Sequence, residues 1–419
     1  MNRSVGAVAV AAAMLLGLSA CGGDDDKDGA AASSSATPGA SSTVKAATGE
    51  PIVLGMINQE NTPAGSFPEI RVADQAAVKY INQELGGVNG RPIQLETCIT
   101  NAAPESSATC ANQLIAKKPI AVTSGVDFGT AASLPLLNKA NIPYVGGVPL
   151  LPPELTSPNS FMFVGGSTSA FPSQSVFLGR EEKAKKVNIL YTDNPSGAAA
   201  ATTYGEKILK ASGVQEVNLI PEKADAADFT SSVTKAAQGN PDAIMVLFSS
   251  QGCSRIMQAG ASLGLTSKIK FYYPGSCVGP AVVKAGGAGA EGARFNTETI
   301  LLGDDDPQVK AFLSAMKTYA GADAVLSSFA QTGFGAIMNI YELLKKMPAD
   351  GITSEALVTA LKATKDQPNF MSHPYTCDGK QVPGLPAVCD AYSKIIEYKG
   401  SKTSYIYNDW LTGADKIGS

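Results

Sequence analysis

Short apolar runs alternate with longer amphipathic stretches along most of the chain. Residues 52–57 and 120–123 are apolar and rich in β-branched side chains, which predicts buried strands. Residues 69–85 place apolar side chains at helical spacing and end at Gly86-Gly87, which predicts a helix with a clear stop. A regular strand and helix alternation predicts a parallel sheet covered by helices on both faces.

The alternation occurs in two successive runs, which predicts an α/β fold with two doubly wound parallel-sheet lobes. In the first run we expect strands at 52–57, 93–96, 120–123 and 142–145, with helices at 69–85, 106–117 and about 130–141. In the second run we expect helices at 170–183, 199–212, 228–238 and 254–263, with strands at 187–191, 217–220, 243–248 and 269–273. A strand at 296–302, helices at 307–319 and 327–347, and strands at 393–398 and 404–407 are expected after them.

The stretch 120–147 is the first candidate for a binding site. Its two predicted strands end in the short segments 125–128 and 146–149. In an open parallel sheet, ligands bind in the crevice beyond the carboxyl ends of the strands, so these segments are expected to line a site. An ordinary strand-helix-strand unit without any site explains the same pattern and stays open.

Composition narrows the classes of function. The chain has 419 residues, 44% of them apolar and 17% charged, which is enough for two domains with cores. The net charge is -4, and the basic residues are scattered instead of forming a stripe, so no nucleic-acid partner is expected.

The N-terminus has the features of an export signal. Residues 1–20 combine a basic start, an apolar run too short for a membrane span, and a small-residue exit, which indicates a signal peptide. The string Leu18-Ser19-Ala20-Cys21 resembles the lipobox of bacterial lipoproteins, which implies that Cys21 carries a diacylglycerol anchor. Residues 21–50 are poor in large apolar side chains and are predicted to be a flexible tether. The alternative is a soluble secreted protein in which Cys21 is incidental.

Six further cysteines fit an oxidising, extracytoplasmic compartment. Proximity in sequence pairs Cys98-Cys110, Cys253-Cys277 and Cys377-Cys389, although six cysteines allow fifteen connectivities and the pairing stays a hypothesis. No zinc-ligand spacing is present, and the single histidine, His373, has no nucleophile near it in sequence. We therefore expect no metal, no cofactor and no catalytic residue.

Several strings in a fixed order resemble the leucine/isoleucine/valine-binding family of type I periplasmic binding proteins. They include INQELGGVNGRPIQL at 81–95, the stretch 120–147, IPYVGGVPLLPPELT at 142–156, PDAIMVLF at 241–248 and KFYYPG at 270–275. The resemblance implies two lobes joined by three crossovers that close on a solute. Carried over, lobe one comprises residues 51–164 plus 298–373, and lobe two residues 165–297 plus 374–419.

The resemblance also implies the ligand contacts. They fall on Asp127, Phe128, Gly129, Gly147, Val148, Phe67 and Phe329 in lobe one, and on Asn194, Ser196, Ser249, Ser250 and Ser276 in lobe two. Asp127 stands where a serine is usual, Gly147 and Val148 stand where an alanine-threonine pair is usual, and no acid lies near Ser276 to hold an ammonium group. These departures favour an amide, a urea-like or polyol compound, or a hydrophobic or aromatic molecule over a plain branched-chain amino acid. Asp127 has the alternative role of an N-cap.

The expected function is that of a lipid-anchored, monomeric receptor that passes a small solute to an ABC permease in the membrane. The alternative is a ligand-sensing ectodomain that signals to a membrane partner. No transmembrane helix or signalling domain follows in the sequence, which favours transport. An extracellular hydrolase would need an acid/base group that the sequence does not show.

Overall fold

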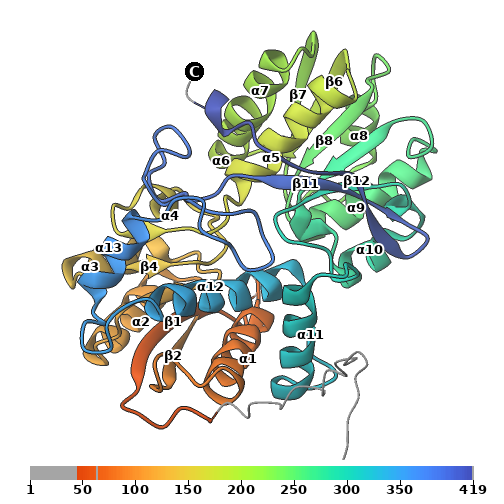
Figure 1. Cartoon of the computed structure of the whole chain (residues 1–419). Coiled ribbons are helices and arrows are strands. Elements are labelled where there is room, and N and C mark those ends of the chain that lie inside the picture. The colour runs from red at the N-terminus through yellow and green to blue at the C-terminus, as the bar shows by residue number, and fades with distance from the viewer. Residues whose placement is uncertain (1–44, 63–64, 418–419) are drawn as a thin grey trace, which may run out of the picture. The chain divides into compact units, whose positions relative to one another are not determined.

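The computed structural model describes residues 45–62 and 65–417 and contains two β-sheets (Figure 1). The predicted signal peptide, Cys21 and the tether up to residue 44 lie outside the described residues. Within the part of the chain that the structure describes, no helix is long and apolar enough to cross a membrane.

The lobe-one sheet is wholly parallel, with the strand order β2-β1-β3-β4-β5. The central strand β1 is buried along almost its whole length, because helices cover both faces of the sheet, and this explains its continuous apolar run. The strands are β1 Ile52–Gln59, β2 Ile93–Thr100, β3 Val122–Ser124, β4 Tyr144–Val145 and β5 Ser160–Phe161. Since all five are parallel, their carboxyl ends meet at one edge, where the predicted site lies.

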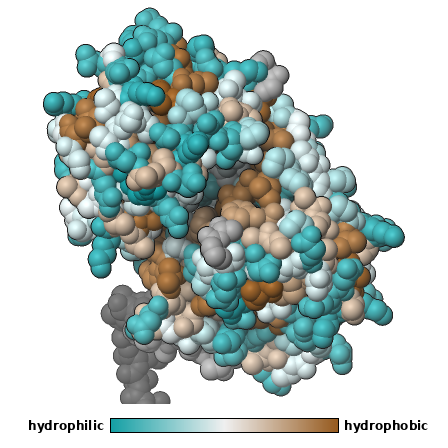
Figure 2. All heavy atoms as spheres, turned by 180° about the vertical axis from the view of Figure 1, so that it is seen from behind, coloured by the Kyte–Doolittle hydropathy of each residue, from teal (hydrophilic) through white to brown (hydrophobic). Residues whose placement is uncertain are grey.

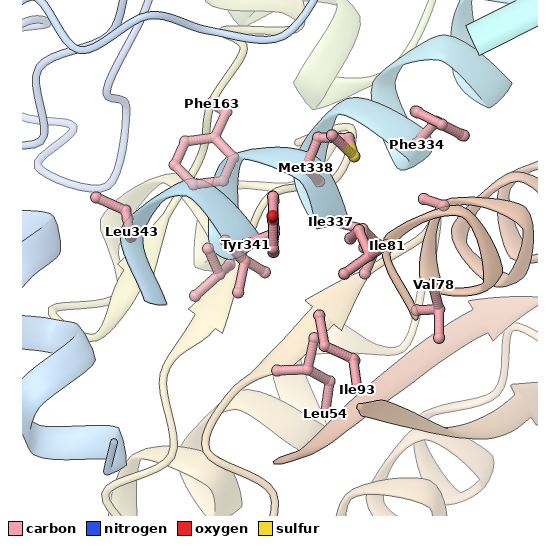
Figure 3. Close-up of a cluster of buried hydrophobic side chains, with 14 of the residues drawn as sticks. Leu54, Val78, Ile81, Ile93, Phe163, Phe334, Ile337, Met338, Tyr341 and Leu343 are labelled. Atoms are coloured by element: carbon pink, nitrogen blue, oxygen red, sulfur yellow. The ribbon is translucent and has the colours of Figure 1, made fainter. Parts of the chain in front are cut away.

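Helices from distant parts of the sequence cover the lobe-one sheet. They are α1 Pro68–Glu84, α2 Pro104–Ala116, α3 Thr130–Lys139, α4 Pro152–Thr156, α11 Pro307–Tyr319, α12 Ser328–Leu344 and α13 Ser354–Lys362. Helices α1, α11 and α12 pack on one face and α2 and α3 on the other. Figure 3 shows Ile81 of α1 and Ile337 of α12 beside Leu54 and Ile93 of the sheet. The helix expected at 327–347 is α12, and most of its residues are buried in this core.

The lobe-two sheet has the order β12-β11-β10-β9-β8-β6-β7. Its strands are β6 Lys186–Thr192, β7 Glu216–Glu222, β8 Ala243–Leu247, β9 Lys270–Tyr273, β10 Arg294–Thr297, β11 Ser393–Lys399 and β12 Lys402–Leu411. Strand β11 pairs antiparallel with both β10 and β12, and the remaining pairs are parallel. The helices of this lobe are α5 Ser167–Val176, α6 Pro195–Ala200, α7 Lys207–Ala211, α8 Thr230–Ala236, α9 Ser250–Ser262 and α10 Pro280–Gly286. The predicted fold class is confirmed, with a C-terminal antiparallel hairpin added at the edge.

Three expected elements differ from the structure. The strand expected at 296–302 ends at Thr297, because Thr299 bridges to Ser372 and the chain leaves the sheet. The single helix expected at 199–212 begins earlier, at Pro195, and contains a π-helical segment between α6 and α7. The helix expected at 170–183 is α5 followed by a π-helical turn at 177–181. Helices α4, α10 and α13 were not predicted.

The crossovers between the sheets lie against one another. The carboxyl group of Glu298 accepts hydrogen bonds from Gly166 N at 2.8 Å and from Ser169 Oγ, which joins the second crossover to the first. Ser372 Oγ donates to the carbonyl oxygen of Glu298, which brings in the third. Beyond Ser372, Tyr375 packs in the lobe-one core, so the start of the segment assigned to lobe two contacts lobe one.

Three disulfides have the pairing that sequence proximity suggested, and that hypothesis is confirmed. Cys98–Cys110 joins β2 to α2, and Cys253–Cys277 joins α9 to the loop after β9. Cys377–Cys389 closes a loop within the third crossover. Only the first two join segments next to predicted contacts, since α2 carries the Ser107 partner of Asp127 and α9 follows Ser249.

Candidate ligand-binding site

Two buried amides at the end of β1 hold the loops of lobe one. Asn58 Oδ1 accepts a hydrogen bond from Val126 N at 3.2 Å, and Asn58 Nδ2 donates to the carbonyl oxygen of Phe67 at 2.9 Å. Gln59 Oε1 accepts from Phe128 N at 3.1 Å. Both amides are fully buried, so they fix the loops after β1 and β3 relative to each other. The sequence analysis did not identify either residue.

Two glycines let these loops approach each other closely. A side chain at Gly125 would overlap Asn58, and one at Gly147, whose φ is +72°, would overlap Ser124. Only glycine tolerates both the space and the positive φ at Gly147. The N–H groups of Gly147 and Val148 make no hydrogen bond within residues 45–62 and 65–417. They are therefore two backbone donors at the predicted positions without a partner in the described part of the chain, although both residues are buried.

Asp127 lies at the predicted position but its carboxylate is engaged inside the protein. Oδ1 accepts from Thr100 Oγ1 at 3.0 Å and from Gly129 N at 3.1 Å, and Oδ2 accepts from Ser107 Oγ. The side chain is 2% exposed. Asp127 thus joins β2, α2 and the start of α3, and its predicted contact with ligand stays a prediction.

Apolar side chains gather beside these loops. The rings of Phe67 and Phe329 meet edge to face with centroids 5.7 Å apart, and both pack against a buried cluster that includes Val148. Phe128 is 37% and Leu150 39% exposed, so both offer apolar surface next to the held loops. Figure 2 shows one face of the molecule with a hollow and apolar residues along part of its rim.

The loop after β4 is held by a buried carboxyl group. Glu154 Oε2 accepts from the N–H groups of Leu150 and Leu151, both at 2.8 Å. Burial raises the pKa of Glu154 to about 8. This group supports the backbone that presents Gly147 and Val148.

A small crevice lies next to Gly147. Its lining includes Val164, Thr299, Thr332 and Ser372, which come from α12 and from all three crossover regions. None of these residues was predicted. Their only common sequence feature is small size, and no local motif links positions so far apart.

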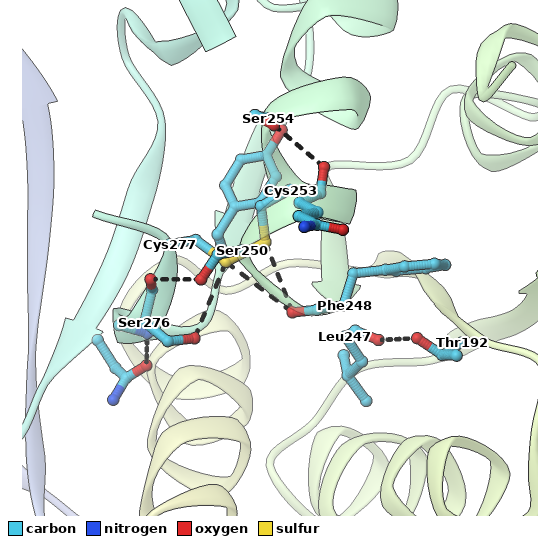
Figure 4. The surroundings of a disulfide bond; sticks show 12 residues. Thr192, Leu247, Phe248, Ser250, Cys253, Ser254, Ser276 and Cys277 are labelled. Carbon is cyan, nitrogen blue, oxygen red and sulfur yellow. Dashed lines mark hydrogen bonds between the residues drawn. A yellow bond between two sulfur atoms is a disulfide. The ribbon is translucent and has the colours of Figure 1, made fainter. Parts of the chain in front are cut away.

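In lobe two, the Cys253–Cys277 disulfide joins α9 to the loop after β9, beside the predicted residues Ser250 and Ser276 (Figure 4). Ser250 Oγ donates to the carbonyl oxygen of Ser276 at 3.1 Å, next to the Cys253–Cys277 bond. Ser249 precedes α9 and makes no capping hydrogen bond with its side chain. The first N–H groups of α9 therefore have no side-chain cap.

Asn194, after β6, and Ser196, in the first turn of α6, are exposed. Asn194 Oδ1 accepts from Gly197 N at 2.7 Å and caps α6. Thr192 Oγ1 donates to Leu247 O at 3.2 Å, which links the ends of β6 and β8. Asn194 and Ser196 thus lie at the start of α6, whereas Ser249 and Ser250 lie at the start of α9 and Ser276 follows β9 in the same lobe.

Comparison with known proteins decides the family. A family model described as "Periplasmic binding protein" matches residues 51–382. The chain belongs to this family. Among solved structures, a substrate-binding protein of an ABC transporter from Sphaerobacter thermophilus has a TM-score of 0.74 and 17% identity, covering 88% of this chain and 100% of that one. A search of curated protein sequences gives no match.

Two further structures similar to this periplasmic binding protein contain ligands. A solute-binding protein from R. palustris in complex with 4-hydroxybenzoate has a TM-score of 0.70 and 18% identity, covering 88% of this chain and 99% of that one. A branched-chain amino acid transporter substrate-binding protein from Streptococcus pneumoniae in complex with isoleucine has a TM-score of 0.68 and 18% identity, with coverage of 86% and 99%. The predicted resemblance to type I periplasmic binding proteins is confirmed.

The crossovers of this periplasmic binding protein contain two buried acids. Burial raises the pKa of Glu298 to about 7 and that of Asp390 to about 6. Asp390 Oδ1 lies 3.1 Å from His373 Nδ1, and the His373 ring stacks on Tyr392 at a centroid distance of 3.8 Å. His373 thus belongs to the crossovers and has an acid partner, and no nucleophile contacts it in the part of the chain that the structure describes.

Proposed function

We propose that the chain is an extracytoplasmic solute-binding protein that captures a small organic molecule between its lobes and delivers it to an ABC importer. The observation that supports this most is the set of fixed loops at the carboxyl ends of the parallel strands. In lobe one these loops present free N–H groups and exposed apolar side chains, while the buried polar side chains hold the loops in place. A surface of this kind binds a solute without offering groups that react with it.

The ligand contacts remain a proposal at the positions predicted from the sequence. In lobe one these are Phe67, Phe128, Gly129, Gly147, Val148 and Phe329, and in lobe two Asn194, Ser196, Ser249, Ser250 and Ser276. Asp127 keeps its predicted place at the edge of the site, although its internal hydrogen bonds favour a supporting role. The proposed ligand is amino-acid-like, an amide, urea-like or aromatic, and the ligands of the two similar proteins fall within this range.

We also propose attachment to the membrane through Cys21. Residues 1–44 lie outside the described part of the chain, so this rests on the signal-like start and the lipobox resemblance. Two acyl chains would suffice for stable anchoring. Changing Cys21 to Ser should move the protein from the membrane fraction to the soluble fraction of the producing cells, and a membrane-bound Cys21→Ser protein would contradict the anchor.

A solute screen tests the receptor function. The purified protein is heated with amino acids, amides, ureas, aromatic acids and sugars, and a bound solute should raise the melting temperature by mass action. Chromatography of the same mixtures should return each solute unchanged, and light scattering should give the mass of a monomer. A screen without any shift, or a solute converted to product, would overturn the proposal.

A further inference from the structure

We propose, building on the solute-binding function above, that the ligand is a compact apolar molecule, best a ring, with a carbonyl or carboxylate oxygen and no ammonium group. The proposal separates this site from one built for amino acids. It rests on three features of the loops: how their acids are used, which donors are free, and which side chains are exposed.

The acids that could hold an ammonium group are already occupied. Asp127 accepts three hydrogen bonds from within lobe one. Glu298 accepts from Gly166 N and Ser169 Oγ in the crossovers. In the loop after β9, the position expected to carry an acid is Ser276, whose carbonyl oxygen accepts from Ser250. An ammonium group brought here would lose its hydration without a carboxylate in return, which costs several kcal/mol.

Asp193 is an acid in the predicted loops whose carboxylate could still hold an ammonium group. Asp193 precedes Asn194 after β6 and is exposed, and no ion pair of its side chain is described within residues 45–62 and 65–417. An exposed carboxylate keeps its hydration and gives an ammonium partner little net free energy. Asp193 is therefore the residue that a decisive experiment has to include.

The free polar groups of the site are mostly donors. Gly147 and Val148 offer two N–H groups without partners in the described structure, and the start of α9 offers further N–H groups beside the hydroxyl of Ser249. Such donors pair with oxygen acceptors, and a helix start adds a favourable field for a carboxylate. A carboxylate and a neutral amide both satisfy these donors.

The apolar part of the site favours a flat body. Phe67 and Phe329 form an edge-to-face pair that packs against the buried cluster containing Val148, and Phe128 and Leu150 leave more than a third of their surface uncovered. A ring placed on this surface gains apolar burial together with favourable aromatic contacts. An aliphatic body of the same size lacks the second contribution.

The test is a calorimetric titration of the full chain with probes that share one ring. Benzoate, benzamide, benzylamine and phenylalanine are compared, together with the strongest hits of the solute screen. We expect the acid or the amide to bind at least tenfold more tightly than benzylamine and phenylalanine, and a tight acid with a weak amide identifies a carboxylate ligand. A strongest ligand that carries an ammonium group, from either set, overturns the inference but leaves the receptor function intact. If no probe and no screened solute binds, the receptor function itself fails.

Two variants locate the binding. Changing Phe329 to Ala should weaken the better probe at least fivefold, provided that circular dichroism shows a folded protein; the milder change Phe329→Leu serves if it does not. Asp193→Asn should leave that affinity within twofold. Binding of phenylalanine that disappears in Asp193→Asn would identify Asp193 as an ammonium partner and refute the inference.

Discussion

Replacing Asp127 with alanine tests whether this carboxylate supports the loops. In the folded protein it joins three segments through Thr100, Ser107 and the N–H group of Gly129. Removing it leaves buried donors without an acceptor. The Thr100 hydroxyl has one alternative, the carbonyl oxygen of Asn58 at 3.5 Å, but the other two donors have none described.

The expected loss of stability follows from these two donors. A buried donor left without a partner costs about 1–3 kcal/mol, so Asp127→Ala should lower the free energy of unfolding by about 3 kcal/mol. Asp127→Asn keeps one oxygen for Thr100 and Gly129 N, and the Ser107 hydroxyl is able to turn and accept from the new amide. That variant should lose only about 1 kcal/mol, the typical contribution of one hydrogen bond.

Urea unfolding followed by far-ultraviolet circular dichroism measures both losses at pH 7. Asp193→Ala serves as the control, because an exposed acid with no described ion pair should change stability by less than about 0.5 kcal/mol. If Asp127→Ala falls as close to the parent protein as this control, the carboxylate does not support the loops. The family-based role at the ligand would then be the better explanation.

Three further predictions concern the cores and a disulfide. Burial raises the pKa of Asp74 to about 8, so the folded state keeps a proton that the unfolded state releases near pH 4, and this group should lower stability as the pH rises from 4 to 8. Because Glu154 and Glu298 contribute to the same fall, Asp74→Asn should reduce it without abolishing it, by about 2–4 kcal/mol in the free energy of unfolding between pH 5 and pH 8, measured by urea titration. An unchanged slope in Asp74→Asn would contradict the assignment. Gly333→Ala should cost about 1–3 kcal/mol by overlapping Asp74, and an equally stable variant would show that α1 and α12 are able to separate. Replacing Cys253 and Cys277 together by Ser should lower the free energy of unfolding by about 3–4 kcal/mol, because the bond closes a loop of the chain. The same change should weaken solute binding. Unaltered affinity would mean that the bond does not position Ser249, Ser250 and Ser276.

Most of the fold could be predicted because its strands are short apolar runs between helices. β1 and β8 are buried on both faces, and such strands leave a clear pattern in the sequence. The strand expected at 296–302 was too long because Leu301 and Leu302 are apolar but pack from a loop. Helix α10 was missed because seven residues with a glycine at the end show no helical period.

The site was harder to predict, because the partners of its polar side chains are distant in sequence. Asp127 could be placed at the edge of the site, but its hydrogen bonds to Thr100 and Ser107 depend on how β2 and α2 pack. Likewise, Asn58 and Gln59 gave no signal of their own, since an amide after a strand is common in loops that bind nothing. The disulfides were predictable because each pair is close in sequence.

Changes to the buried polar groups and to the exposed apolar groups of the proposed site should affect the affinity for solutes in different ways. Asn58, Gln59 and Asp127 hold backbone segments of the proposed site, so changing them should lower the affinity for all solutes by a similar factor. Phe128 and Phe329 present only surface, so changing them should alter the ratio of affinities between ring-shaped and aliphatic solutes. The charged residues of the proposed site have found partners inside the protein, so they contribute little to the choice of solute. The backbone donors and the apolar surface therefore determine which solute binds.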